Sequence, residues 1–182
     1  MKVVRIRGRK GDAFMVKHGG VFLVDGEVDV ESLAPKSLLE RAKTLMRETG
    51  VEIDPTPYAI DGEMGLRKLM GLVFEEFVYR ILTQNFGRVE RNKKSLEPIG
   101  RIAGRRVHAY PDFVVEGKVA VEAKVGECYP DQVYEYSRVF GIGAVVFPHS
   151  GFCRVPKGWR SIPWLVKDPK PLVEFVSRAI GQ

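Results

Sequence analysis

The chain has 182 residues, a formal net charge of +6, and 45% hydrophobic and 29% charged residues. This composition excludes global disorder, and the length predicts one domain, or one domain with a small extension. No apolar run approaches the roughly 20 residues of a membrane helix, and the first residues do not resemble a secretory leader, so we expect a cytoplasmic protein with no membrane partner.

The first 60 residues predict a small β-rich extension that ends in a helix. Apolar and basic residues alternate over 2–7, as in a half-buried strand, and Phe14–Lys17 and Val21–Val24 are further short strands. A stripe of apolar side chains predicts a helix over Ser37–Thr49. We assign residues 1–60 to this N-terminal extension. The sequence leaves its role open between a homodimer interface, a DNA clamp and a dock for another partner.

Positive charge is concentrated in two blocks. The first ten residues hold five basic residues and no acid, and residues 88–106 hold seven basic residues and two acids. Each block therefore carries +5, on a body whose remaining charge is −4. Clustered Lys and Arg neutralise DNA phosphates and release counterions. For the second block we expect DNA contacts from Arg88, Arg91, Lys93, Lys94, Arg101, Arg105 and Arg106.

Helices and strands alternate in the rest of the chain, beyond a proline-containing linker at residues 52–63. The predicted elements are a helix over Met64–Phe86, strands over Val107–Val115 and Lys118–Val125 with a turn at Glu116–Gly117, a helix over Asp131–Phe140, a strand over Ala144–Phe147 and a helix over Pro169–Ile180. The basic segment before the strands contains the proline and glycines of a loop or hairpin. Residues 61–182 therefore predict an α/β domain with a strand hairpin at its centre.

Three polar residues on the predicted hairpin carry the chemistry. Asp112 lies on the first strand, and Glu122 and Lys124 lie two apart on the second, so they share one face of the sheet. Two close carboxylates repel each other unless a cation neutralises them, and oxygen ligands favour a hard divalent ion such as Mg²⁺ or Mn²⁺. The backbone carbonyl of Ala123 is a further candidate ligand. Beside the ion, the Lys124 ammonium would orient the attacking water, help to deprotonate it, or stabilise charge that develops on phosphorus.

These residues resemble the PD-(D/E)xK nuclease superfamily. Pro111-Asp112, nine intervening residues and then Glu122-Ala123-Lys124 match its motif. The resemblance covers roughly residues 64–150 and implies a restriction-endonuclease-like core of helix, mixed sheet with hairpin, helix and strand. It assigns 61–182 to a nuclease-like domain that hydrolyses DNA phosphodiester bonds with Mg²⁺ or Mn²⁺.

Two flanking helices extend the resemblance. Upstream, Gly71 to Glu75 fits a family pattern that places an acid on the helix, which makes Glu75 the third candidate metal ligand. Downstream, Gln132 and Tyr136 are four residues apart on one helix face, as in the RecB-like branch, where these types lie near the active site and the strand. The upstream helix has no histidine, which makes it more similar to the restriction-endonuclease and archaeal-resolvase branches.

The resemblance therefore implies a RecB-like deoxyribonuclease that acts on DNA. A dimeric Holliday-junction resolvase and a non-catalytic nucleic-acid-binding module on the same scaffold remain alternatives. The chain has two cysteines, so we expect no four-cysteine iron–sulfur cluster. The sequence permits a disulfide between Cys128 and Cys153, although a reduced pair is the default in the cytoplasm.

Overall fold

The computed structural model describes residues 2–8, 11–18, 21–25, 35–92, 98–102, 105–108 and 110–181, with side chains described in 35–92 and 110–181. The chain divides into two compact units, Met1–Val73 and Phe74–Gln182, with the boundary inside a helix. Among the helices of the described residues, none combines the length and apolarity needed to cross a membrane.

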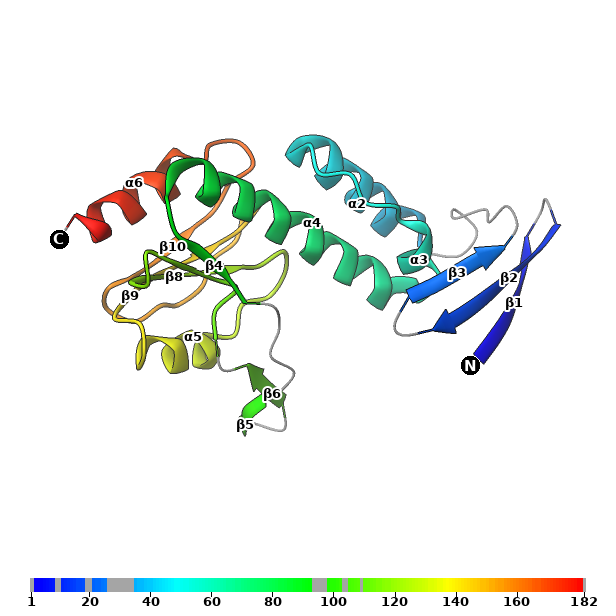
Figure 1. The fold of residues 1–182 in the computed structure, drawn as a ribbon, viewed down its shortest axis with the longest axis horizontal. Coiled ribbons are helices and arrows are strands. Elements are labelled where there is room, and N and C mark those ends of the chain that lie inside the picture. Colours follow the sequence, from blue (N-terminus) through cyan, green and yellow to red (C-terminus); the bar gives the residue numbers. More distant parts are fainter. Residues whose placement is uncertain are drawn as a thin grey trace. The chain divides into compact units, whose positions relative to one another are not determined.

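The first unit combines a small sheet with helices (Figure 1). Its strands form an antiparallel sheet in the order β1-β2-β3, with bounds Lys2–Gly8, Gly11–His18 and Val21–Asp25. The helices are α2 (Lys36–Thr49), α3 (Thr56–Ala59) and the first half of α4 (Gly62–Asn85). The predicted β-rich extension is corrected here, because within residues 1–60 the helices α2 and α3 hold 18 described residues, nearly as many as the 20 in the three strands. The predicted linker also contains the short helix α3.

Helix α4 follows the prediction closely. Its buried side chains recur every three or four residues, which is the spacing of one helix face: Leu66, Leu69, Met70, Val73, Phe74, Val78, Ile81 and Leu82. Glu75 and Glu76 lie at the edge of this face and are half-buried. The apolar stripe therefore sets which glutamates of the helix remain accessible.

The second unit is built on one five-stranded mixed sheet. Its strand order is β10-β9-β8-β7-β4, with bounds β4 Val89–Arg91, β7 Phe113–Val115, β8 Val119–Ala123, β9 Ile142–Val146 and β10 Trp159–Ile162. Strand β8 pairs antiparallel with β7 and parallel with β9. Strands β5 (Pro98–Ile102) and β6 (Arg105–His108) form a separate two-stranded hairpin. The α/β class and the central hairpin are as expected, whereas β4 and β10 were not predicted.

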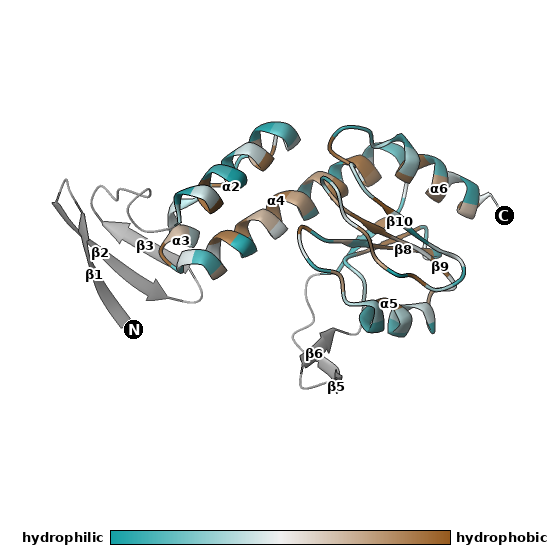
Figure 2. Ribbon diagram, turned by 180° about the vertical axis from the view of Figure 1, so that it is seen from behind, coloured by the Kyte–Doolittle hydropathy of each residue, from teal (hydrophilic) through white to brown (hydrophobic). Residues whose placement is uncertain are grey.

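Helices cover both faces of this sheet. Figures 1 and 2 show the second half of α4 and the C-terminal helix α6 (Lys170–Ile180) on one side and α5 (Pro130–Ser137) on the other. On the α5 side, Val133 and Tyr136 pack against Ala120 and Val145 in the core. Central strand β8 is thus buried on both faces, as a strand between two helical layers must be.

The β7–β8 hairpin turns where the sequence predicts. Glu116 and Gly117 have positive φ angles of 50° and 65°, and with Lys118 they form a three-residue connection between the paired residues Val115 and Val119. Pairing runs from Val115 opposite Val119 to Phe113 opposite Val121. The next residue beyond Phe113 is Asp112, and its neighbour across the ladder is therefore Glu122.

The two cysteines form a disulfide. Cys128 lies in the loop after β8, and Cys153 lies in the segment before β10. Their Cα atoms are 5.5 Å apart, within the range that a disulfide spans. The structure therefore has the disulfide that the sequence permitted, rather than the reduced pair that was the default expectation.

Candidate active site

The open end of the β7–β8 hairpin brings two carboxylates together. The Asp112 amide donates a hydrogen bond to Glu122 Oε2 at 3.1 Å, and the Ala123 amide donates to Asp112 Oδ2 at 2.8 Å. Each carboxylate thus accepts a hydrogen bond from a backbone amide of the opposite arm of the hairpin. Glu122 is 3% exposed, which is exceptional for a glutamate unless it is paired.

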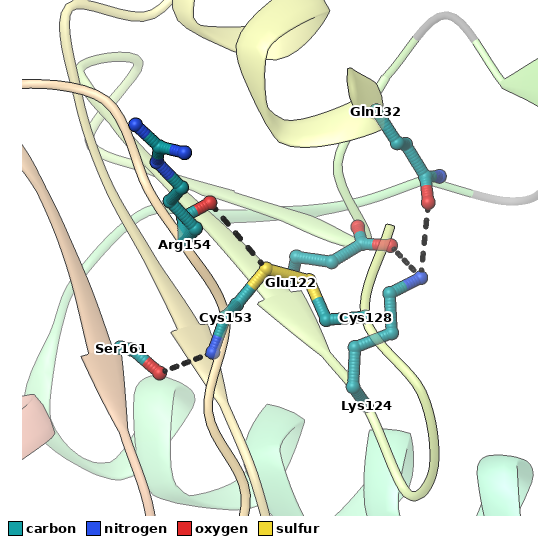
Figure 3. Close-up of a disulfide and its surroundings, with 7 residues drawn as sticks. All are labelled: Glu122, Lys124, Cys128, Gln132, Cys153, Arg154 and Ser161. Atoms are coloured by element: carbon teal, nitrogen blue, oxygen red, sulfur yellow. Dashed lines mark hydrogen bonds and ion pairs between the residues drawn. A yellow bond between two sulfur atoms is a disulfide. The ribbon is translucent and has the colours of Figure 1, made fainter. Parts of the chain in front are cut away.

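Lys124 connects the carboxylates to helix α5. Its ammonium lies 2.6 Å from Glu122 Oε1 and donates to Gln132 Oε1 at 3.2 Å (Figure 3). The Gln132 amide then donates to the Tyr136 hydroxyl at 2.5 Å. Glu122, Lys124, Gln132 and Tyr136 therefore form one continuous polar chain, and we call it the Lys124 chain.

The charges around the Lys124 chain determine the protonation states of Lys124 and Tyr136. Burial lowers the pKa of Lys124, but Glu122, Asp112 and Glu75 together outweigh it, so the pKa is raised above its ordinary value. Burial, followed by the negative charge of Glu122, raises the pKa of the Tyr136 hydroxyl far above its ordinary value. Lys124 is consequently an ammonium and Tyr136 a neutral phenol at physiological pH.

A cavity of about 170 Å³ opens onto these groups. Its lining consists of all six predicted site side chains together with Ala123 and two residues that the sequence analysis missed: Glu75, Asn92, Tyr110, Asp112, Glu122, Ala123, Lys124, Gln132 and Tyr136. Asn92 donates from its amide to the Tyr110 carbonyl at 3.4 Å, and its backbone amide donates to the Asp112 carbonyl at 2.9 Å. Asn92 thereby holds the segment that carries Asp112. No spacing rule identifies it, because β4 pairs with β7 across a long intervening segment.

The donor set of this cavity suits a hard divalent ion. In an extended strand the N–H and C=O of one residue point to the same side, so the Ala123 carbonyl faces Asp112, to which its amide donates. Two carboxylates and a carbonyl are oxygen ligands of the kind that Mg²⁺ prefers, with water or phosphate completing the shell. Within the described residues, no group of three or more His, Cys, Asp or Glu side chains is close enough to hold an ion by itself.

The two glutamates of α4 have different surroundings. Glu75 lines the cavity with Asp112 and Glu122. Glu76 instead pairs with Arg91 at 2.6 Å and with Arg80 at 3.4 Å, outside the cavity. The helix therefore presents only Glu75 to the site.

The predicted DNA-binding residues differ in how far the structure describes them. Lys93 and Lys94 lie outside the described residues. Arg101 is on β5 and Arg105 and Arg106 are on β6, where the backbone alone is described. The side chain of Arg88 is 70% exposed and pairs with Glu90. DNA contact by this set stays a prediction.

Arg91 has protein partners on three sides. Besides Glu76, its guanidinium lies over the Tyr79 ring at 5.2 Å and near the Phe113 ring at 5.9 Å. It therefore connects β4 to α4 and β7 at the foot of the hairpin.

We expect Arg91→Met to lower the free energy of unfolding by about 1–2 kcal/mol, because a half-buried ion pair and a cation–π contact are lost together. The exposed Arg88→Met is the matched control and should change stability by less than about 0.5 kcal/mol. Urea unfolding of both variants measures the difference. Equal stability of the two variants would contradict the structural role of Arg91.

A connected cluster of charged and polar side chains at one end of the central hairpin is thus the candidate active site. Its members come from α4, the β7–β8 hairpin and α5. Comparison of the chain with protein-family models, with curated proteins and with solved structures finds no match.

Proposed function

We propose that this protein is a divalent-metal-dependent deoxyribonuclease that hydrolyses DNA phosphodiester bonds. One observation carries the proposal: Asp112, Glu122, Lys124 and Glu75 line a single cavity, although a fold without such chemistry has no need to hold three acids and a lysine together. Bringing these charged groups together out of water costs free energy, so such groups are found buried mainly where they are paired or where they serve a function.

The proposed family is the PD-(D/E)xK nuclease superfamily, and the proposed branch is RecB-like. The order of α4, the β7–β8 hairpin, α5 and β9 is the order of a restriction-endonuclease-like core. The contact between Gln132 and Lys124 supports the RecB-like assignment, since it joins the downstream helix motif to the ExK triplet. The four-residue spacing then explains why Tyr136 holds Gln132 in turn.

Asp112, Glu122 and the Ala123 carbonyl would hold Mg²⁺ or Mn²⁺, and Glu75 would bind the ion or one of its waters. When bound, such an ion lowers the pKa of water and polarises the phosphoryl oxygen. Glu122 would be shared between the ion and Lys124. This sharing accounts for a carboxylate that is almost fully buried.

Lys124 acts as a fixed positive charge in this proposal. Its ammonium lies 2.6 Å from Glu122 Oε1 and stabilises the negative charge that develops on the phosphoryl oxygens. Gln132 and Tyr136 hold the ammonium at one place, which removes reorganisation from the reaction step.

The proposed substrate is DNA, which the basic segment before β7 would lead to the cavity. A homodimer through the N-terminal extension and a cytoplasmic location stay predictions. The Cys128–Cys153 disulfide bears on the location, because disulfides are uncommon in most reducing cytoplasms.

The test compares Asp112→Asn with Asp131→Asn. Both make the same chemical change, but Asp131 is exposed on the first turn of α5, outside the cavity. The amide side chain introduced by Asp112→Asn retains an oxygen that accepts from the Ala123 amide, so we expect the fold to persist. Cleavage of single-stranded, duplex, flap and four-way-junction DNA in Mg²⁺ and Mn²⁺ should fall about 100-fold or more in Asp112→Asn and remain unchanged in Asp131→Asn.

Three results would argue otherwise. Equal cleavage by wild type and Asp112→Asn contradicts the assigned site. DNA binding without cleavage in every arm favours the non-catalytic module, and cleavage confined to the four-way junction by a dimer favours the resolvase.

A further inference from the structure

The disulfide is attached to the loop that joins two members of the Lys124 chain. Cys128 follows Lys124 by four residues and precedes Gln132 by four, so it lies at the midpoint of the connection. This connection has no regular secondary structure before α5 begins at Pro130. Its ends are joined by the contact between Lys124 Nζ and Gln132 Oε1, and its middle is joined by the disulfide (Figure 3).

The other half of the disulfide is anchored in the core. Cys153 is 2% exposed and belongs to the buried cluster that contains Tyr136 and Trp159. Its backbone amide donates to the Ser161 hydroxyl on β10 at 3.0 Å. Cys128 packs against the same cluster from the loop side. The disulfide therefore links the loop to the buried cluster that also contains Tyr136, the last residue of the Lys124 chain.

We propose that Cys128 and Cys153 are positioning residues of the active site: their disulfide holds the 124–132 loop so that Gln132 meets the Lys124 ammonium, and its reduction slows the proposed cleavage reaction. The inference rests on the proposed nuclease function. Its physical basis is that residues 124–129 of this connection, which include Gly126, belong to no helix or strand, so the crosslink at Cys128 restrains them. Displacement of a catalytic group by about 1 Å is enough to cost two orders of magnitude in rate.

The redox step is thiol–disulfide exchange with a small dithiol. A thiolate of the reductant attacks Sγ of Cys128, the less buried of the two cysteine residues. A mixed disulfide forms at Cys128, and Cys153 leaves as a thiolate that takes up a proton. The second thiolate of the reductant then attacks the reductant's other sulfur, which is bonded to Cys128 in the mixed disulfide. Cys128 is released as a thiolate and is also protonated. Two electrons and two protons pass to the protein, and the dithiol becomes a cyclic disulfide.

The first experiment compares oxidised and reduced wild-type protein in Mg²⁺, well below the unfolding temperature. Thiol counting with a chromogenic disulfide should give no thiol per chain before reduction and two after it. We expect reduction by dithiothreitol to lower kcat about tenfold with KM within about twofold, because the loop orients Lys124 rather than binding DNA. The double variant Cys128→Ser/Cys153→Ser should match the reduced wild type and should not respond to dithiothreitol.

The second experiment measures how well the 124–132 loop is held in place, independently of DNA cleavage. Amide hydrogen exchange over residues 124–137 should be faster in the reduced protein and in the double variant, while exchange in α6, which holds no cysteine, stays the same. Faster local exchange in a protein that cleaves no DNA in either state would support the positioning role and contradict the nuclease function. Equal kcat and equal exchange in the two thiol states, or an equal rise of exchange in α6, would overturn the positioning role.

Discussion

Lys124→Met is expected to lose DNA cleavage by about 10²- to 10³-fold while it retains metal binding. Methionine fills the volume of the lysine stem but removes the charge that stabilises the transition state. Asp112, Glu122 and the Ala123 carbonyl are untouched, and removal of a neighbouring positive charge favours a bound cation. Titration with Mn²⁺ should therefore give an affinity equal to or tighter than that of wild type.

The same variant should be unstable without metal. The Glu122 side chain is 4% exposed and has Lys124 as its ion-pair partner. Removing one member of a buried pair leaves the other charge uncompensated, at a cost of about 3 kcal/mol. A divalent ion at 100 times its Kd returns about 2.7 kcal/mol by mass action, so Mg²⁺ should restore most of the loss in urea unfolding.

The matched control for this variant is Lys118→Met, at an exposed turn residue just before β8. Its ammonium contacts the Ile180 carbonyl at 3.5 Å and lies outside the cavity. Cleavage, stability and metal affinity should all match wild type. Wild-type cleavage by Lys124→Met, or a stability that Mg²⁺ does not change, would contradict the role assigned to Lys124.

Glu122→Gln is expected to lose both cleavage and metal binding. Each Glu122 oxygen accepts a contact: Oε1 faces the Lys124 ammonium and Oε2 faces the Asp112 amide. A glutamine has one acceptor oxygen and one NH₂ group, so either orientation sets a donor against a donor. We expect a loss of about 2–3 kcal/mol in the free energy of unfolding and about 10³-fold or more in cleavage rate.

The response to Mg²⁺ separates the two variants. Mg²⁺ should not restore the stability of Glu122→Gln, because the carboxylate that would bind it is gone. The control Glu127→Gln, an exposed glutamate in the following loop, should behave as wild type in thermal unfolding with and without Mg²⁺. Full rescue of Glu122→Gln by Mg²⁺ would remove Glu122 from the proposed ligand set.

The local parts of the site follow from the sequence because their geometry is local. The sequence places the hairpin turn at Glu116–Gly117, and a strict two-residue loop there would set Asp112 opposite Val121. Lys118 is a third loop residue in the structure, and the resulting register makes Asp112 the neighbour of Glu122. The apolar stripe of α4 likewise sets Glu75 at its edge. Turn type and helix period act over a few residues, so short-range patterns carry them.

The tertiary structure decided which distant residues complete the site. Asn92 reaches the cavity because β4 pairs with β7 in the sheet. Arg91, on β4, forms an ion pair with Glu76 of α4 outside the cavity. Strand β10 pairs in parallel with β9 through a connection that no local pattern specifies. The sequence by itself thus determined the hairpin, its carboxylates and the helix faces. Only packing between distant segments brought Asn92 to the cavity and Cys128 to Cys153, because such contacts depend on closing long loops and burying shared surface rather than on neighbouring residues.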